Sequence, residues 1–150
     1  KTIKGNSTTS ASFNKIDGKK INQKKNIRVT VYAYKMVAGK KVILAKTIIA
    51  HLAGTKSVKY TNPKALELTK SAYQIKIKKT AQIEAKVTLE NSKKKLLPES
   101  HAAKFRYKSS NTKIATVNKN GEIKGKSKGT CYIYVYTVNG LMKKVKVTVK

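Results

Sequence analysis

The stretch of sequence that decides the fold is residues 107–121, YKSSNTKIATVNKNG. The Ser-Ser-Asn run at 109–111 carries short polar side chains that can bond to nearby backbone groups and hold a tight turn. Residues 114–117 alternate as expected of a strand that crosses one sheet, and Asn-Gly at 120–121 lets the chain reverse at little steric cost. Because turn, strand and turn follow in this order, the stretch predicts a β-sheet scaffold and marks no active site.

Apolar and polar residues alternate with a period of two along most of the chain, and no segment has the period of an amphipathic helix. Turn signals separate the alternating runs, among them Asp-Gly at 17–18, residues 36–40 and Asn-Gly at 139–140. The predicted strands cover residues 9–16, 27–33, 42–52, 73–77, 81–89, 114–117, 132–138 and 142–149, and a further strand starts with Phe105 and Tyr107. Short strands at this spacing are typical of β-sandwiches, so the predicted fold class is all-β.

A family resemblance rests on an ordered series of residues in the second part of the chain. From Ala65 to Lys150 the sequence resembles the bacterial immunoglobulin-like domain of group 2. The residues that carry the resemblance are 109–111 (SSN), 114–117 (IATV), 120–123 (NGEI), Gly125, 129–130 (GT), the alternating run 131–138 and 145–149 (VKVTV). Tyr107 stands where the family usually has tryptophan, and Lys79 where it tends to have glycine. The resemblance implies an immunoglobulin-like sandwich, in a family that occurs in adhesins and as repeated spacer modules.

Residues 1–54 resemble the last three strands of a fibronectin type III domain. The carriers are Thr8-Thr9-Ser10, the alternating run 27–33 and Ala45-Lys46-Thr47, although the family usually has a tyrosine near Ile27. About fifty residues in a few strands bury too little apolar surface for independent stability. We therefore expect tandem immunoglobulin-like sandwiches of which the first is incomplete, either truncated at its N-terminus or completed by a partner chain, for example in a homo-oligomer. The predicted organisation is an incomplete unit at 1–54, a linker at 55–64 and a group 2 domain at 65–150.

The balance of charge is strongly basic, with 35 lysines and arginines against 6 acidic residues and a formal net charge of +29. Such a field attracts polyanions and is screened by salt. Only Arg28 and Arg106 are arginines, whereas proteins that read bases rely on the planar guanidinium group. We therefore expect contacts with anionic polymers and no specific nucleic-acid partner. The chain has no apolar run long enough for a transmembrane helix.

Side chains that could carry catalysis or bind a metal are few and scattered. No two of the six acidic residues lie within five positions of each other, and His51 and His101 are isolated in the sequence. Cys131 alternates in phase with Ile133 and Val135, which predicts a small core residue. Calcium sites need clustered oxygen ligands. We therefore expect no enzymatic activity, no metal and no cofactor.

The sharper candidate for recognition is a run of tyrosines at alternate positions. Tyr132, Tyr134 and Tyr136 should project from one face of one strand, near Lys144 and Lys146 of the following strand. Aromatic rings can stack on sugar rings, and lysines can bind carboxylates or phosphates. The alternative is that these tyrosines simply cover the sheet and pack against lysine stems.

These observations predict a non-catalytic extracellular module of a bacterial cell-surface or secreted protein, acting as a spacer or in cell adhesion. The alternative function is a binding module for acidic glycans or anionic cell-envelope polymers. The expected partners are cell-wall polymers, acidic glycans or a host surface. The chain opens on Lys1 in mid-pattern, so we expect it to be a piece of a longer protein.

Overall fold

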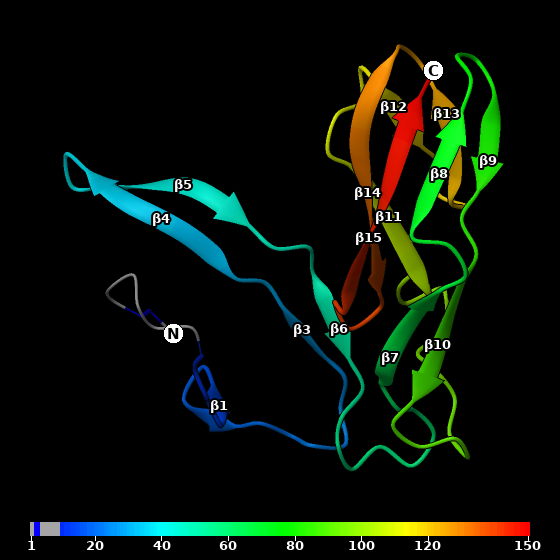
Figure 1. The fold of residues 1–150 in the computed structure, drawn as a ribbon. Coiled ribbons are helices and arrows are strands. Elements are labelled where there is room, and N and C mark those ends of the chain that lie inside the picture. The colour runs from blue at the N-terminus through cyan, green and yellow to red at the C-terminus, as the bar shows by residue number, and fades with distance from the viewer. Residues whose placement is uncertain (1, 4–9) are drawn as a thin grey trace.

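The computed structural model describes residues 2–3 and 10–150, and this part of the chain contains strands and no helix (Figure 1). In chain order the strands are β1 (Lys15–Ile16), β2 (Lys19–Lys20), β3 (Ile27–Val29), β4 (Tyr32–Val37), β5 (Lys40–Lys46), β6 (Ala50–Leu52), β7 (Pro63–Leu68), β8 (Ala72–Ile75), β9 (Thr80–Gln82), β10 (Ala85–Leu89), β11 (Phe105–Ser109), β12 (Ala115–Val117), β13 (Glu122–Gly125), β14 (Gly129–Thr137) and β15 (Met142–Val149). The prediction of an all-β fold is confirmed.

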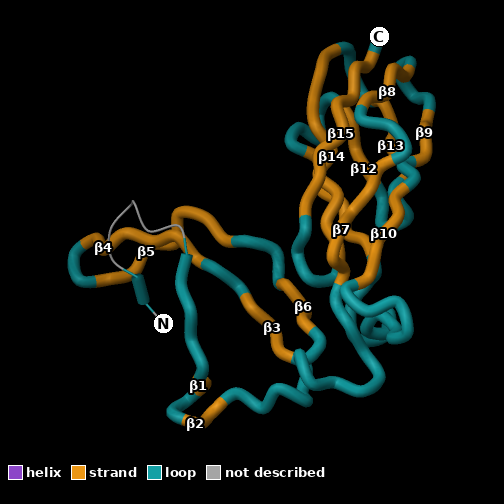
Figure 2. Tube along the Cα trace, turned by 60° about the horizontal axis from the view of Figure 1, so that its bottom comes forward, coloured by secondary structure: helices purple, strands orange, loops and turns teal. Residues whose placement is uncertain are grey.

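The second part of the chain, from β7 onward, is a two-layer sandwich (Figure 2). One layer is a four-stranded sheet in the order β11-β14-β15-β8, in which β8 pairs parallel to β15. The sheets β12-β13-β9 and β10-β7 lie opposite. The alternating strands send one row of side chains between the layers, where Ile133, Val135 and Val145 of one layer pack against Ile123 and Leu66 of the other. This core positions the four-stranded sheet with its other face outward.

Three long strands predicted from alternation are each divided in two. Residues 81–89 belong to β9 and β10, which pair in different sheets, and buried Ile83 lies at the change of sheet. Residues 27–33 and 42–52 are interrupted where the backbone N–H of Thr47 donates to the carbonyl oxygen of Val31 and Val31 N–H donates to Thr47 Oγ1. The Thr47 hydroxyl accepts a hydrogen bond that a backbone carbonyl oxygen would accept in a regular ladder. The pairing of β4 with β5 therefore ends here, and the pairing of β3 with β6 forms a separate sheet.

The strand predicted at residues 9–16 is wrong in its extent. The structure has only Lys15–Ile16, paired with Lys19–Lys20 across the predicted Asp-Gly turn, and residues 10–14 form no strand; residue 9 lies outside the described residues. All four residues of this small ladder are exposed. The stretch has no neighbouring strand beyond β2 among the described residues, so alternation alone does not extend it.

The turn before β9 has Lys79 at the position where the family tends to have glycine. Lys79 donates its N–H to the carbonyl oxygen of Lys76, and the left-handed residue of the turn is Lys78, with φ of 65°. The backbone of this turn is anchored to Gly125, whose carbonyl accepts from Lys78 N–H and whose N–H donates to the carbonyl of Lys79. Two ladder-like bonds therefore hold a lysine in a conformation that glycine adopts with less strain.

The two parts of the chain meet at a packed junction. Ala53, Leu97 and Val138 are buried together there. His51 N–H donates to the carbonyl oxygen of Val138 at 2.9 Å, which ties β6 to the end of β14. Ser57, Thr61 and Pro63, within the segment predicted as a linker, are also buried. Backbone hydrogen bonds join this segment to both parts of the chain, from Lys56 N–H to the carbonyl oxygen of Gln23 and from Thr61 N–H to that of Lys95.

Asn62 and Arg106 supply the polar bonds of this junction. The side-chain oxygen of Asn62 accepts from the N–H of Ala53 at 2.8 Å. Arg106 donates from Nη1 to the carbonyl oxygen of Ile49 and from Nη2 to the carbonyl oxygens of Thr137 and Val138. One guanidinium group therefore satisfies three carbonyl groups that belong to both parts of the chain.

Candidate functional site

The outer face of the four-stranded sheet carries the side chains that are best placed for recognition. The inward residues of β14 are buried in the core, so Tyr132, Tyr134 and Tyr136 project from the opposite side of the strand. On β15, Lys146 pairs with Tyr132 and Lys144 pairs with Tyr134. The alternation of each strand puts them on the same side of the sheet.

A third lysine comes from the strand on the other side of β14. Lys108 of β11 pairs with Tyr134, opposite the pairing of Tyr134 with Lys144. The tyrosines therefore form a central stripe with lysines on both flanking strands. We call this surface the tyrosine face and define it by Lys108, Tyr132, Tyr134, Tyr136, Lys144 and Lys146.

Two pairs of side chains on the tyrosine face interact. Lys144 Nζ lies 4.8 Å from the ring centroid of Tyr132, within the range of a cation–π interaction. The ring centroids of Tyr134 and Tyr136 are 6.4 Å apart, with their planes tilted by 37°. Burial, and to a lesser degree the neighbouring Tyr134, raise the pKa of Tyr136. The face is thus an aromatic surface edged by positive charge, suited to contact the apolar faces of sugar rings and to bind anionic groups.

All five residues proposed from the sequence, Tyr132, Tyr134, Tyr136, Lys144 and Lys146, lie together on this face. Their role in binding a ligand stays a prediction. Lys108 was not among the residues proposed from the sequence, which predicted that a strand starts with Phe105 and Tyr107 but did not predict which strands lie beside it. The alternation that starts at Phe105 would have placed Lys108 outward, but only the register puts it beside Tyr134.

The histidines, the cysteine and the acidic residues were also considered as candidates for metal binding or catalysis. No group of three or more histidine, cysteine, aspartate or glutamate side chains in the described part of the chain is placed to hold a metal ion. His51 and His101, isolated in the sequence, meet edge to face with ring centroids 5.0 Å apart at the junction. Cys131 is buried, as predicted, and burial raises the pKa of its thiol, which disfavours the nucleophilic thiolate.

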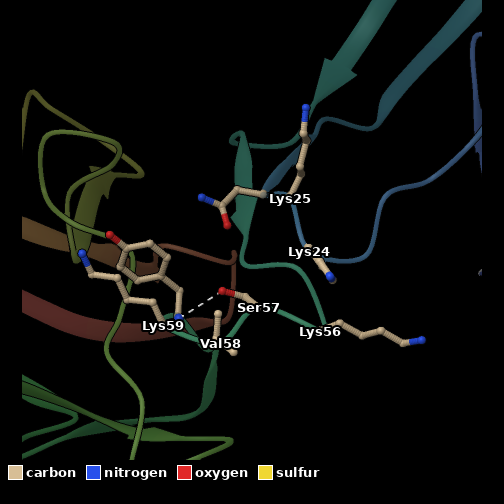
Figure 3. A pocket seen from close by; sticks show the side chains of 8 residues that line it. Lys24, Lys25, Lys56, Ser57, Val58 and Lys59 are labelled. Carbon is tan, nitrogen blue, oxygen red and sulfur yellow. Dashed lines mark hydrogen bonds between the residues drawn. The ribbon is translucent and has the colours of Figure 1, made fainter.

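A hollow of about 540 Å³ is lined by residues 24–26 and 56–60, and its lysines do not point toward one common position (Figure 3). Lys24, Lys25 and Lys56 come from two loops, and Figure 3 shows their ammonium groups pointing in different directions. Val58, at the rim, is 93% exposed. Lysines that diverge over an open hollow favour diffuse attraction of polyanions, and they do not converge on one anionic group.

The solved structures that match this chain include an S-layer protein and an intimin. Domains 4 and 5 of the S-layer protein SbsC match with 14% identity and a TM-score of 0.47, over 67% of this chain and 62% of that one. A mutant of intimin from EHEC O157:H7 matches with 13% identity and a TM-score of 0.41, over 57% of this chain and 46% of that one. A longer SbsC structure, rSbsC(31-844), matches with 10% identity and a TM-score of 0.47, over 90% of this chain and 21% of that one.

The chain thus spans less than two thirds of the length of each of these structures. A search of curated proteins found no match. In the residues that the structure describes, no helix is long and apolar enough to cross a membrane.

Residues 64–149 match the family model described as "Bacterial Ig-like domain (group 2)". The match covers more than half of the chain and confirms the resemblance found in the sequence. The chain therefore belongs to the bacterial immunoglobulin-like domains of group 2.

Proposed function

We propose that this chain is a non-catalytic extracellular module of a bacterial cell-surface or secreted protein, and that it acts as a stiff spacer. Immunoglobulin-like domain families are generally non-catalytic, and membership of the group 2 family supports a place at the bacterial surface. The observation that carries the spacer role is the junction, where Arg106 and His51 bond across the two parts of the chain.

A stiff spacer needs a junction that fixes the orientation of one part of the chain relative to the other. A flexible linker leaves domains free to rotate, whereas a packed and hydrogen-bonded one restricts them. Here the junction has an apolar centre of Ala53, Leu97 and Val138 and a rim of bonds to backbone carbonyl groups. The strongly basic surface, with a net charge of +29, would hold such a module close to an anionic envelope.

The test is the distribution of distances between the two parts of the chain, measured by pulsed electron paramagnetic resonance. Spin labels at Lys25→Cys and Lys124→Cys report on the first and second parts, and both native side chains are exposed. Cys131 is 3% exposed and so escapes labelling. We expect a narrow distribution that broadens in Arg106→Gln, because the neutral amide cannot reach three carbonyl groups. A broad distribution in the wild-type sequence contradicts a spacer.

A second candidate function, binding of acidic glycans or anionic envelope polymers, is supported by the tyrosine face. The supporting observation is that lysines flank the tyrosine stripe on both sides, from β11 and from β15. A chain of acidic sugars lying along β14 would place ring faces on the tyrosines and carboxylates near Lys108 and Lys144.

A glycan array read at about 150 mM salt separates this candidate from nonspecific attraction, since the Debye length is then only ~8 Å. Binding through the face predicts that Tyr134→Ala abolishes the signal, whereas Tyr32→Ala, in the first part of the chain, leaves it unchanged. Lys108→Ala and Lys124→Ala remove the same charge, but only Lys108 belongs to the face. Equal loss in these two lysine variants would mean diffuse electrostatic binding, which leaves the spacer role as the sole candidate.

A further inference from the structure

Both arginines and both histidines of this lysine-rich chain meet at the junction between its two parts. Arg28 and His51 are directly opposite each other on β3 and β6. The backbone N–H of His51 donates to Val138 and not to β3, so this is a non-hydrogen-bonded pair, in which the side chains lie closest. The ring of His101 meets that of His51 edge to face, with centroids 5.0 Å apart. These three side chains therefore occupy neighbouring positions.

Arg106 brings the second guanidinium group to the same place. Its Nη2 atom donates to the carbonyl oxygen of Val138, which also accepts from the N–H of His51. Its Nη1 atom donates to the carbonyl oxygen of Ile49, two positions before His51. Two members of the group come from each part of the chain. The four side chains, which we call the junction cluster, are Arg28, His51, His101 and Arg106.

The positive charge of the junction cluster is not compensated within the described part of the chain. Burial lowers the pKa of His51, and the nearby positive groups lower it further, whereas no described carboxylate acts on the pKa of His51 or of Arg106. Glu99, the acidic residue closest to His101 in the sequence, is exposed and has no such effect. His51 Nδ1 and Arg106 Nε are buried and have no hydrogen-bond partner among the described residues. The cluster is therefore short of both negative charge and hydrogen-bond acceptors.

The chemistry of the four side chains suits an oxyanion that carries two charges. A guanidinium group keeps its charge and offers a planar fork of donors to phosphate or carboxylate oxygens, and a neutral imidazole ring still donates one N–H. A carboxylate would neutralise only one of the two arginines. Arg28 and His101 are exposed and so are open to a ligand, whereas Arg106 is held by backbone carbonyl groups and contributes mainly its charge.

We propose that the junction cluster binds a phosphate group, with Arg28 and His101 in contact with its oxygen atoms. A phosphate group in this position would accept hydrogen bonds from both parts of the chain and would neutralise charges that the fold places close together. Binding would therefore hold the junction together. The proposal goes beyond the spacer role, and it does not depend on the tyrosine face, which shares no residue with the junction cluster.

The experiment titrates the full chain with inorganic phosphate and follows the ring signals of the two histidines by NMR. Phosphate replaces chloride at a constant ionic strength of about 150 mM and at about pH 8, above the second pKa of a phosphate group. We expect saturable shifts of both histidine rings with phosphate and with sulfate, and only weak shifts with acetate. No saturable shift with phosphate, or equally strong binding of acetate, overturns the proposal.

Matched variants separate the junction cluster from diffuse attraction. Arg28→Gln and Lys35→Gln each remove one charge from an exposed strand residue, but Lys35 lies in the separate β4–β5 sheet. We expect Arg28→Gln to weaken phosphate binding at least about tenfold and Lys35→Gln to leave it unchanged. Equal effects of the two variants contradict a defined site. Amide signals of β6 and β14 recorded without phosphate check that both variants keep the fold.

His101→Gln tests the contribution of the second part of the chain. His101 is exposed in a loop, so its replacement leaves the strands intact. We expect weaker phosphate binding in this variant and unchanged binding in Lys108→Ala, which alters the tyrosine face. The reverse result would place the phosphate group on the tyrosine face and overturn the proposal.

A titration with glycerol phosphate distinguishes two sources of the phosphate group. Binding of glycerol phosphate as well as inorganic phosphate would support a ligand whose phosphate group belongs to a larger molecule. Binding of inorganic phosphate alone would support the free ion as the ligand. Binding of neither excludes a phosphate site at the junction.

Discussion

The Nη1 atom of Arg106 lies 2.5 Å from the carbonyl oxygen of Ile49, 57 positions away in the chain, and donates a hydrogen bond to it. The same guanidinium group bonds to Thr137 and Val138 through Nη2. Substitution by lysine keeps the charge but replaces a planar fork by a single ammonium group. We expect Arg106→Lys to lower the free energy of unfolding by about 1–3 kcal/mol.

Urea denaturation measures this loss, and limited proteolysis of residues 47–62 reports whether the junction opens. Arg28→Lys is the control, because Arg28 is exposed on β3. If both substitutions have the same small effect, the bonds made by Arg106 do not stabilise the junction.

The junction should also weaken in acid, because protonation of His51 is disfavoured in the folded state. Burial lowers the pKa of His51 from 6.5, and the nearby His101, Arg106 and Arg28 lower it further. The unfolded chain therefore binds the proton more readily than the folded chain does. Stability is fully present above pH 6.5 and is lost as the pH falls through the lowered pKa of the folded state.

Urea denaturation across this pH range, in the wild type and in His51→Gln, tests the prediction. We expect the neutral glutamine to reduce the loss of stability in acid. An NMR titration in which His51 protonates above pH 6.5 would contradict the assigned direction.

Adjacent residues of β14 should respond very differently to truncation. Ile133 has no exposed surface, so Ile133→Ala leaves a cavity and should cost about 2–5 kcal/mol. Tyr132 is 36% exposed and contacts Lys144, so Tyr132→Ala should lower the free energy of unfolding by no more than about 1 kcal/mol. Thermal or urea unfolding of the two variants measures the difference. Similar losses would mean that the inward and outward sides of β14 are misassigned.

Tyr107 covers Gly121 so closely that the glycine has a packing role as well as a conformational one. Gly121 has φ of 82°, and a Cβ atom there would lie 2.7 Å from Tyr107 Cζ. Gly39 has φ of 74°, and a Cβ atom there would meet no other atom within 4 Å. Backbone strain should lower the free energy of unfolding of both alanine variants by about 1 kcal/mol or more. We expect a larger decrease in Gly121→Ala, and the difference measures the overlap with Tyr107. Equal decreases in the two variants, measured by urea denaturation, would contradict this overlap.

The turn before β9 offers a stabilising substitution. Lys78 has φ of 65°, a conformation that costs a residue with a side chain more than it costs glycine. We expect Lys78→Gly to raise the free energy of unfolding by about 0.5–1 kcal/mol, after allowance for the greater freedom of glycine in the unfolded chain. The measurement is urea denaturation, with Lys76→Gly in the neighbouring strand-end position as the control. A loss of stability in Lys78→Gly would show that its side chain makes a contact that outweighs the backbone strain.

Much of the second part of the chain could be predicted because β-sheet faces are encoded locally. A period of two assigns Ile133 to the core and Tyr134 to the outside without any knowledge of neighbouring strands. The turn at 120–121 is marked by residues that tolerate left-handed backbone. The limits of the long strands were less predictable, since the alternation continues unchanged where residues 81–89 pass from one sheet to another.

What only the tertiary structure decided is which residues become neighbours. Alternation by itself determined that Lys108 and Tyr134 face outward, but the antiparallel register of β11 and β14 puts them side by side. The contact of His51 with His101 and the bond from Arg106 to Ile49 depend on the packing of two distant segments. Such contacts join residues far apart in the sequence, and they arise from the pairing and packing of whole strands, which no local pattern of residues specifies.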